Sequence, residues 1–204
     1  MHAIILSLMK VLVFGSSIIK YLKAHDREKK HKIGNINAKF YYRGFSGKSF
    51  EFFINNAPAI DDVLTSYNII PDYVIVHLGG NSITTNSTRA TLVASCTQFY
   101  DLLRARLDII NPNAIVIASP VLQRYVYNYN YDTPQPTQYN TLRNHINDRI
   151  RILRCIDFML RTTGPNNLDN EKSFRDGVHL KSKGNDFLLG EIIHKVGIAH
   201  GVIK

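Results

Sequence analysis

The sequence predicts an α/β fold, a three-layer α/β/α sandwich in which helices cover both faces of a mostly parallel sheet. Two observations carry this prediction. Short runs of β-branched apolar residues, typical of strands buried on both faces, recur along the chain. Segments of helical periodicity separate these runs, and this alternation is typical of a parallel sheet. Of the 204 residues, 45% are hydrophobic, so we expect one domain spanning residues 1–204.

The expected strands and helices follow each other along the chain. Apolar runs predict strands at residues 11–14, 73–78 and 114–118, with a less regular candidate at 156–160. Helical periodicity predicts helices at residues 17–30, 49–67, 88–110, 139–154 and 182–196. The only long irregular stretch is 121–138, rich in Tyr, Asn and Pro. Long loops within compact domains commonly serve as lids or binding loops.

The formal net charge of +9 raises the question of nucleic-acid binding. The densest basic run is 20–32, but Asp26 and Glu28 interrupt it, and no zinc-finger or RNP-type motif accompanies it. We therefore interpret the run as a solvated helix face and do not favour nucleic acid as a partner.

The two cysteines and the N-terminal segment carry weak signals. Cys96 and Cys155 lack CxxC spacing, which favours buried free thiols. Residues 1–15 are apolar but lack a basic leader and a small-x-small cleavage site. No stretch approaches the roughly 18 apolar residues that a membrane span needs. We expect a soluble, cytoplasmic protein, and the sequence does not indicate its oligomeric state.

Reactive groups in open α/β sheets gather at the carboxyl ends of the strands. Directly after the first expected strand comes Gly15-Ser16-Ser17, a tight turn into a helix. Such a turn presents a hydroxyl beside free backbone N–H groups and the positive end of the helix dipole. A serine before a helix is also an ordinary N-cap, so this segment alone does not identify a nucleophile.

Two glycine-containing loops are expected at the same edge of the sheet. Gly79-Gly80-Asn81-Ser82 follows the strand at 73–78, and the amide of Asn81 can point into a cleft there. The loop from Gly44 to Lys48 opens a helix and can supply one more N–H donor. Both have alternatives, because Gly-Gly-Asn is ordinary turn chemistry and the second loop can be a phosphate nest, although it lacks P-loop spacing.

A fourth segment pairs Asp176 with His179 across a turn that contains Gly177. An aspartate at this spacing can return its carboxylate to the imidazole and fix the tautomer that leaves the other nitrogen free as a base. Of the eight histidines, only His179 has such a partner outside a helix. The alternative is an Asx-turn beside an exposed histidine.

Together the four segments resemble the four blocks of the SGNH (GDSL-like) hydrolase family, in the family's order. The family patterns are G-D-S, G-x-S-G, G-x-N-D and D-x-x-H. They stand here as Gly15-Ser16-Ser17, Gly44-Phe45-Ser46-Gly47, Gly79-Gly80-Asn81-Ser82 and Asp176-Gly177-Val178-His179. The likeness reaches from about residue 10 to about residue 195 and implies an SGNH/flavodoxin-like sandwich.

The resemblance implies a serine esterase that forms an acyl-enzyme and requires no metal or organic cofactor. Ser17 would be the nucleophile, His179 the general base and Asp176 its orienting partner. The implied oxyanion hole consists of the backbone N–H groups of Ser17 and Gly47 and the side-chain amide of Asn81.

Two departures from the family pattern concern carboxylates that support the site. Ser16 replaces the acid before the nucleophile, and Ser82 replaces the acid after Asn81. Ser46 lies in a segment that only superficially resembles a G-x-S-x-G elbow. The sequence leaves open esters of sugars, lipid esters and thioesters as substrates, with acetyl as one candidate acyl group. The alternative function is an inactive module of the same fold that binds an anionic polymer such as nucleic acid.

Overall fold

The computed structural model describes residues 8–126, 134–162, 168 and 171–203. Within them a six-stranded sheet has the order β2-β3-β1-β4-β5-β6, and every neighbouring pair is parallel except β2 with β3. The strands are β1 (Met9–Gly15), β2 (Lys30–Ile33), β3 (Ile36–Gly44), β4 (Tyr73–His77), β5 (Ile115–Ala118) and β6 (Phe158–Met159). The five parallel strands have the flavodoxin-like order of doubly wound sheets. The prediction of a mostly parallel α/β sheet is confirmed.

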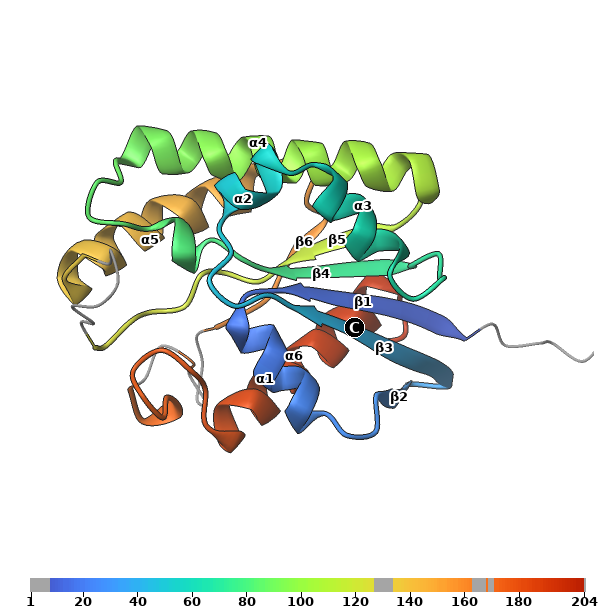
Figure 1. Ribbon diagram of the computed structural model, residues 1–204. Coiled ribbons are helices and arrows are strands. Elements are labelled where there is room, and N and C mark those ends of the chain that lie inside the picture. Colours follow the sequence, from blue (N-terminus) through green and yellow to red (C-terminus); the bar gives the residue numbers. More distant parts are fainter. Residues whose placement is uncertain (1–7, 127–133, 163–167, 169–170, 204) are drawn as a thin grey trace, which may run out of the picture.

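Helices cover both faces of this sheet (Figure 1). They are α1 (Ser17–His25), α2 (Phe50–Asn55), α3 (Pro58–Thr65), α4 (Arg89–Ile110), α5 (Pro136–Ile152) and α6 (Ser182–Ala199). Two short 3₁₀ turns, η1 (Gly80–Ser82) and η2 (Glu171–Ser173), complete the described elements. Helices α2 to α5 lie on one face, and α1 and α6 lie on the other (Figure 1). Among the described helices, none is both long and apolar enough to cross a bilayer.

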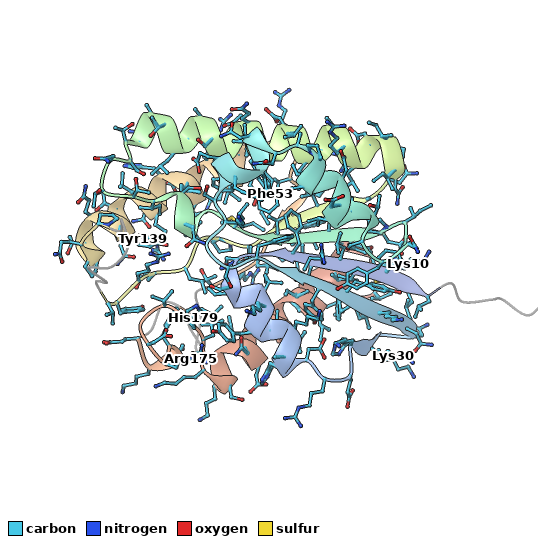
Figure 2. The ribbon with its side chains drawn as sticks, in the orientation of Figure 1. Lys10, Lys30, Phe53, Tyr139, Arg175 and His179 are labelled. Atoms are coloured by element: carbon cyan, nitrogen blue, oxygen red, sulfur yellow. The ribbon has the colours of Figure 1, made fainter. Side chains whose placement is uncertain are left out.

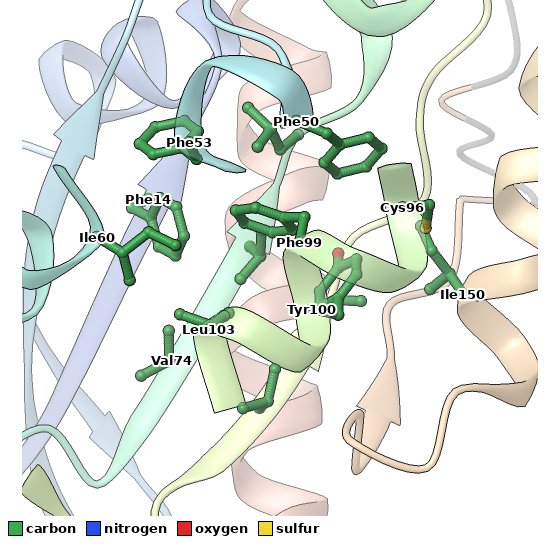
Figure 3. Packing of buried hydrophobic residues seen from close by; sticks show 14 of the residues in the cluster. Phe14, Phe50, Phe53, Ile60, Val74, Cys96, Phe99, Tyr100, Leu103 and Ile150 are labelled. Carbon is green, nitrogen blue, oxygen red and sulfur yellow. The ribbon is translucent and has the colours of Figure 1, made fainter. Parts of the chain in front are cut away.

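Alternation along the buried strands divides the core between the two faces. Phe14 of β1 points into the cluster under α2 and α4, where it meets Phe53 and Phe99 at ring-centroid distances of 6.0 and 6.3 Å (Figure 3). Its neighbour Val13 points to the opposite face and joins the cluster under α1 and α6. Because both faces of β1 are buried, its carboxyl end is held firmly, and that is where the candidate site lies.

The expected helix at 17–30 is too long, and the hairpin that follows it was not predicted. Helix α1 ends at His25, and residues 30–33 and 36–44 form an antiparallel pair. The cause is Asp26, which is 4% exposed. Its carboxylate accepts the backbone N–H of Lys29 at 3.1 Å and contacts the imidazole of His31 at 3.0 Å and the hydroxyl of Tyr42. These bonds turn the chain back, so the basic run 20–32 is divided between a helix and an edge strand.

The expected helix at 49–67 is two helices. Helix α2 ends at Asn55, and α3 begins at Pro58. The chain leaves the helical conformation at Asn56, with φ of −130° and ψ of 61°, and Pro58 then begins α3 because proline is favoured in the first turn of a helix. The candidate strand at 156–160 is confirmed in part, as β6. The cysteines are free as expected, although only Cys96 is buried and Cys155 is partly exposed.

Gly15 ends β1 in a conformation that other residues rarely adopt, with a φ of 154°. A β-carbon at this position would lie 1.9 Å from the carbonyl oxygen of His77 in the neighbouring strand. We expect Gly15→Ala to lower the free energy of unfolding by about 2 kcal/mol or more, measured by chemical denaturation. Gly190→Ala is the control, because the space around this helical glycine is open and alanine favours helix. Equal stability of the two variants would contradict the clash.

Candidate active site

Ser17 is the first residue of α1, separated from the carboxyl end of β1 by one residue. The preceding residue is the N-cap, because the Oγ of Ser16 accepts the backbone N–H of Ile18 at 3.3 Å. The backbone N–H of Ser16 also donates to the carbonyl of His77 on β4, at 2.8 Å. Capping is therefore the role of Ser16, and the hydroxyl of Ser17 is available for a different partner.

That partner is His179, and the two side chains begin a chain of three. The Oγ of Ser17 lies 3.1 Å from the Nε2 of His179. The Nδ1 of His179 lies 2.8 Å from the Oδ2 of Asp176. The structure thus brings together three residues that the sequence separates by up to 162 positions. In Figure 2, His179 lies near the N-terminal end of α1, at the end of the sheet opposite Lys10 and Lys30.

The loop that carries His179 is fixed by its own hydrogen bonds. The Oδ1 of Asp176 accepts the backbone N–H groups of Val178 and His179, at 3.1 and 2.7 Å. A bridge between Phe174 and Leu180 closes the base of the loop. Both sequence interpretations of this segment are therefore realised at once, since one carboxylate oxygen makes the Asx-turn and the other holds the imidazole.

The electrostatics of Asp176 decide which nitrogen of His179 carries the hydrogen. Partial burial acts to raise the pKa of Asp176, but hydrogen bonds from the backbone and ring of His179 and from Val178 outweigh it. The net result is a pKa below the ordinary 3.8. An ionised carboxylate only accepts hydrogen bonds, so Nδ1 is the donor. In a neutral imidazole Nε2 is then an acceptor facing the Ser17 hydroxyl.

Tyr21 and Arg175 hold the other side of this pair. The ring of Tyr21 meets the imidazole of His179 edge to face, with centroids 4.9 Å apart. The guanidinium of Arg175 lies over the Tyr21 ring at 4.1 Å, and its Nε is 3.5 Å from the Oδ2 of Asp176. These contacts limit rotation of the imidazole away from Ser17.

Asn81 reaches the site from η1, after β4. Its Nδ2 donates to the backbone carbonyl of Lys48 at 3.1 Å. Its Oδ1 accepts from the Nη2 of Arg124 at 3.1 Å. An amide nitrogen carries two hydrogens, and the bond to Lys48 uses one of them. Asn81 and Ser17 line the same pocket.

Gly47 is less directly placed than the sequence suggests. It is exposed, has a φ of 71°, and lies in the turn between β3 and α2. Gly47 is not among the described residues that line the pocket beside Ser17. Its connection to the site runs through Lys48, whose carbonyl holds Asn81. Ser46 is likewise exposed.

The pocket beside Ser17 is small, with a volume of about 40 Å³. Its walls come from the ends of β1 and β4, the segment after β5 and the start of α5. The lining residues are Ser16, Ser17, Ile18, His77, Gly80, Asn81, Val121, Leu122, Gln123, Arg124, Tyr139 and Val178. His77 is buried, contacts the Oγ of Ser119 at 2.8 Å, and has its pKa lowered to about 4 by burial. It is therefore neutral near pH 7.

The two serines that replace family carboxylates support the backbone of the site. Ser82 is buried, and its Oγ accepts the backbone N–H of Phe50 at 2.9 Å, at the start of α2. Ser16 caps α1 as described above. Within the described ranges, no three His, Cys, Asp or Glu side chains gather closely enough to hold a metal ion.

Sequence reasoning did not identify Arg124, Tyr139 or His77 as part of the site. Arg124 and Tyr139 lie in or beside the loop 121–138, for which a lid or binding role was one interpretation, but neither residue was assigned a role. The available signal was position, because Arg124 follows the carboxyl end of β5 closely. The residues 127–133 of the same loop lie outside the described part of the chain.

Known proteins share this sequence pattern and this fold. The model of the GDSL-like Lipase/Acylhydrolase family matches residues 13–187. A carbohydrate esterase family 3 structure from Talaromyces cellulolyticus has a TM-score of 0.63 and 17% identity, covering 97% of this chain and 100% of that one. A lipase/acylhydrolase from Enterococcus faecalis has a TM-score of 0.57 and 16% identity, covering 93% and 96%.

A catalytic mutant of an acetylxylan esterase from Geobacillus stearothermophilus is also similar. Its TM-score is 0.53 at 15% identity, covering 93% of this chain and 94% of that one. No curated protein sequence matches the chain. At such low identities the solved structures establish the fold alone.

Proposed function

Because the chain belongs to the GDSL-like lipase/acylhydrolase family and is by class a serine ester hydrolase, we propose that it cleaves short acyl esters, foremost acetyl esters. The substrate class is a small-molecule or carbohydrate ester. The observation that carries the proposal is the hydrogen-bonded chain from Ser17 through His179 to Asp176. This is the arrangement that activates a serine hydroxyl as a nucleophile.

In the first half of the reaction the enzyme is acylated. The Oγ of Ser17 attacks the carbonyl carbon while its proton passes to the Nε2 of His179. The tetrahedral intermediate then collapses, the bond from carbon to the alcohol oxygen breaks, and His179 returns the proton to that oxygen. In the second half, water attacks the acyl-serine, His179 takes its proton, and the acid leaves as the proton returns to Ser17. Asp176 stabilises the imidazolium at each stage.

The oxyanion needs donors placed before the reaction begins. The backbone N–H of Ser17 lies at the N-terminus of α1, where N–H groups are not used by the helix itself. The second hydrogen on the Nδ2 of Asn81 supplies a side-chain donor on the same pocket. We propose the N–H of Gly47 as the third donor, on the resemblance of its segment to the family's second block.

The size of the pocket argues for a short acyl chain. Its volume of about 40 Å³ is far below the roughly 300–1,000 Å³ typical of pockets for larger ligands. Val121 and Tyr139 form part of its wall, and both are buried. Such a space favours a methyl group over a longer acyl chain, because extra methylenes forced against packed side chains typically cost about 1–3 kcal/mol.

Hydrolysis rates of p-nitrophenyl esters of increasing chain length test this assignment. We expect kcat/KM to fall by at least about tenfold from acetate to butyrate and further to octanoate, since each 1.4 kcal/mol corresponds to a factor of ten. Val121→Ala removes two methyl groups from the wall and should narrow the difference between acetate and butyrate. Ile109→Ala is the control, because Ile109 is 79% exposed and lies on α4. A preference for octanoate would contradict the proposed acyl specificity.

A further inference from the structure

Arg124 contacts Asn81 from outside the proposed triad. Its Nη2 donates to the Oδ1 of Asn81 at 3.1 Å and lies 3.3 Å from the carbonyl oxygen of Gly80. Its guanidinium also lies over the ring of Tyr139, with the Cζ 4.7 Å from the centroid. One side chain thus joins η1, which carries Asn81, to the first turns of α5.

The backbone of Arg124 is anchored as firmly as its side chain. Its N–H donates to the Oδ1 of Asn140 at 3.3 Å, and its carbonyl accepts from the Nδ2 of Asn140 at 3.2 Å. Asn140 lies on α5, next to Tyr139. Two adjacent residues of one helix therefore fix the position from which the guanidinium reaches Asn81.

This contact determines which way the Asn81 amide faces. A guanidinium has donors and no acceptor, so the amide atom that it contacts must be the oxygen. The nitrogen is then turned toward Lys48, whose carbonyl can only accept. The two contacts select the same rotamer, and that rotamer keeps the two amide hydrogens on the side of Asn81 away from Arg124.

We propose that Arg124 is a positioning residue that orients and polarises the Asn81 amide for stabilising the oxyanion. A hydrogen bond from a charged donor is stronger than a neutral one, and it draws electron density toward the amide oxygen. The N–H groups of the same amide become better donors as a result. The inference rests on the proposed function, because it assigns Arg124 a role through Asn81 in that reaction.

Loss of the Arg124 side chain should lower mainly kcat. Charge develops on the carbonyl oxygen only as the transition state forms, so a weakened donor matters most at that point. Losing one oxyanion-hole donor outright costs about 100- to 1,000-fold in kcat. Arg124→Met keeps the Asn81 amide as a donor but no longer fixes its orientation. We therefore expect kcat to fall by about 10- to 50-fold, a smaller effect than removal of the Asn81 amide, and KM to change by less than threefold.

A double-mutant cycle on p-nitrophenyl acetate tests whether Arg124 acts through Asn81. Asn81→Ala should lower kcat by about 100-fold or more. Adding Arg124→Met to Asn81→Ala should lower it by less than about threefold further, because the group that Arg124 positions is already gone. Losses that multiply in full, or a change confined to KM, would overturn the proposal.

Arg149→Met is the matched control for loss of an arginine. Arg149 is also partly buried. It lies on α5 and donates to the Oγ1 of Thr97 on α4, and neither residue lines the pocket beside Ser17. This variant should retain kcat within about twofold. Melting temperatures of all variants separate loss of activity from loss of folded protein.

A spectroscopic readout tests the same contact independently of turnover. The side-chain amide signals of Asn81, identified by their loss in Asn81→Ala, should shift in Arg124→Met and stay in place in Arg149→Met. Unchanged signals in Arg124→Met would overturn the proposal. If the wild-type enzyme neither hydrolyses esters nor reacts with a fluorophosphonate, the proposed function fails, and the amide spectrum still decides whether Arg124 sets the state of Asn81.

Discussion

Replacing Ser17 with alanine is expected to abolish ester hydrolysis, by about 10⁴-fold or more in kcat. The reason is structural, because the hydroxyl lies 3.1 Å from the Nε2 of His179. Alanine lacks the oxygen that forms the acyl-enzyme. The reaction could then proceed only by direct attack of water on the ester, which is far slower. The measurement is the rate of p-nitrophenyl acetate hydrolysis, together with covalent labelling of the wild-type serine by a fluorophosphonate.

Two neighbouring serines provide the controls for this variant. Ser46→Ala should keep full activity, since Ser46 is exposed and contributes no atom to the pocket. Ser16→Ala should remain active but lose about 1 kcal/mol of stability, because it removes the N-cap of α1. An active Ser17→Ala beside an inactive Ser46→Ala would show that the nucleophile has been assigned wrongly. A wild-type protein that takes no label would favour the alternative of a binding module.

The central strands were predictable because their pattern depends only on burial. Residues 11–14 are hydrophobic at every position and 73–78 at every position except His77, which is what two covered faces favour. The hairpin of β2 and β3 was missed for the opposite reason. In β3 buried residues alternate with partly buried or exposed ones, and β2 is a sheet edge of four residues with only Ile33 buried. Most of β2 belongs to the basic run 20–32, which was interpreted as a helix face, and only the turn at Asp26 separates it from α1.

In the candidate site, a contact between residues close in the sequence was predictable from the local pattern, whereas the contact of Arg124 with the distant Asn81 was not. Asp176 and His179 are three residues apart, so their contact follows from the geometry of one loop. Ser17 and Asn81 were recognisable because each follows a strand end in a family-like block. Arg124 acts across 43 positions on Asn81, and no local pattern marks it. Its role depends on where α5 places Tyr139 and Asn140, which only the assembled fold shows.

The structure also explains how the site is built with serines in place of two carboxylates. The Oγ of Ser82 is bonded to the backbone of Phe50, which fixes the start of α2 beside η1. The Oγ of Ser16 caps the helix that carries Ser17. Both functions require an acceptor oxygen rather than a negative charge. Proton transfer in the proposed reaction involves neither residue, so the substitutions leave its steps intact.

Replacing His179 with alanine is expected to reduce kcat by about 10⁴-fold or more, because no other described group accepts the Ser17 proton. Asp176→Asn should also be severe. The amide oxygen of an asparagine would keep the two backbone N–H groups that Oδ1 now accepts. Its NH₂ group would then face Nδ1 and favour the tautomer with hydrogen on Nε2, which cannot act as the base.

The pH dependence of kcat/KM tests the same pair in the unmodified enzyme. A protonated imidazole cannot accept the Ser17 proton, so the proposed reaction requires the neutral form of His179. Activity should therefore fall at acidic pH while the protein stays folded. The pKa of Asp176 lies below 3.8 and that of His77 is lowered to about 4, so neither group explains a decline above pH 5.

Unfolding caused by protonation of Asp176 does not explain a loss of activity above pH 5 either. A carboxylate whose pKa is lower in the folded state than in the unfolded state stabilises the fold above the unfolded value of 3.8. That stability is lost only as the pH falls through the lower, folded value. Activity that is undiminished at acidic pH in folded protein would mean that His179 does not serve as the base. The Ser17 to His179 contact would then be structural, whatever the identity of the nucleophile.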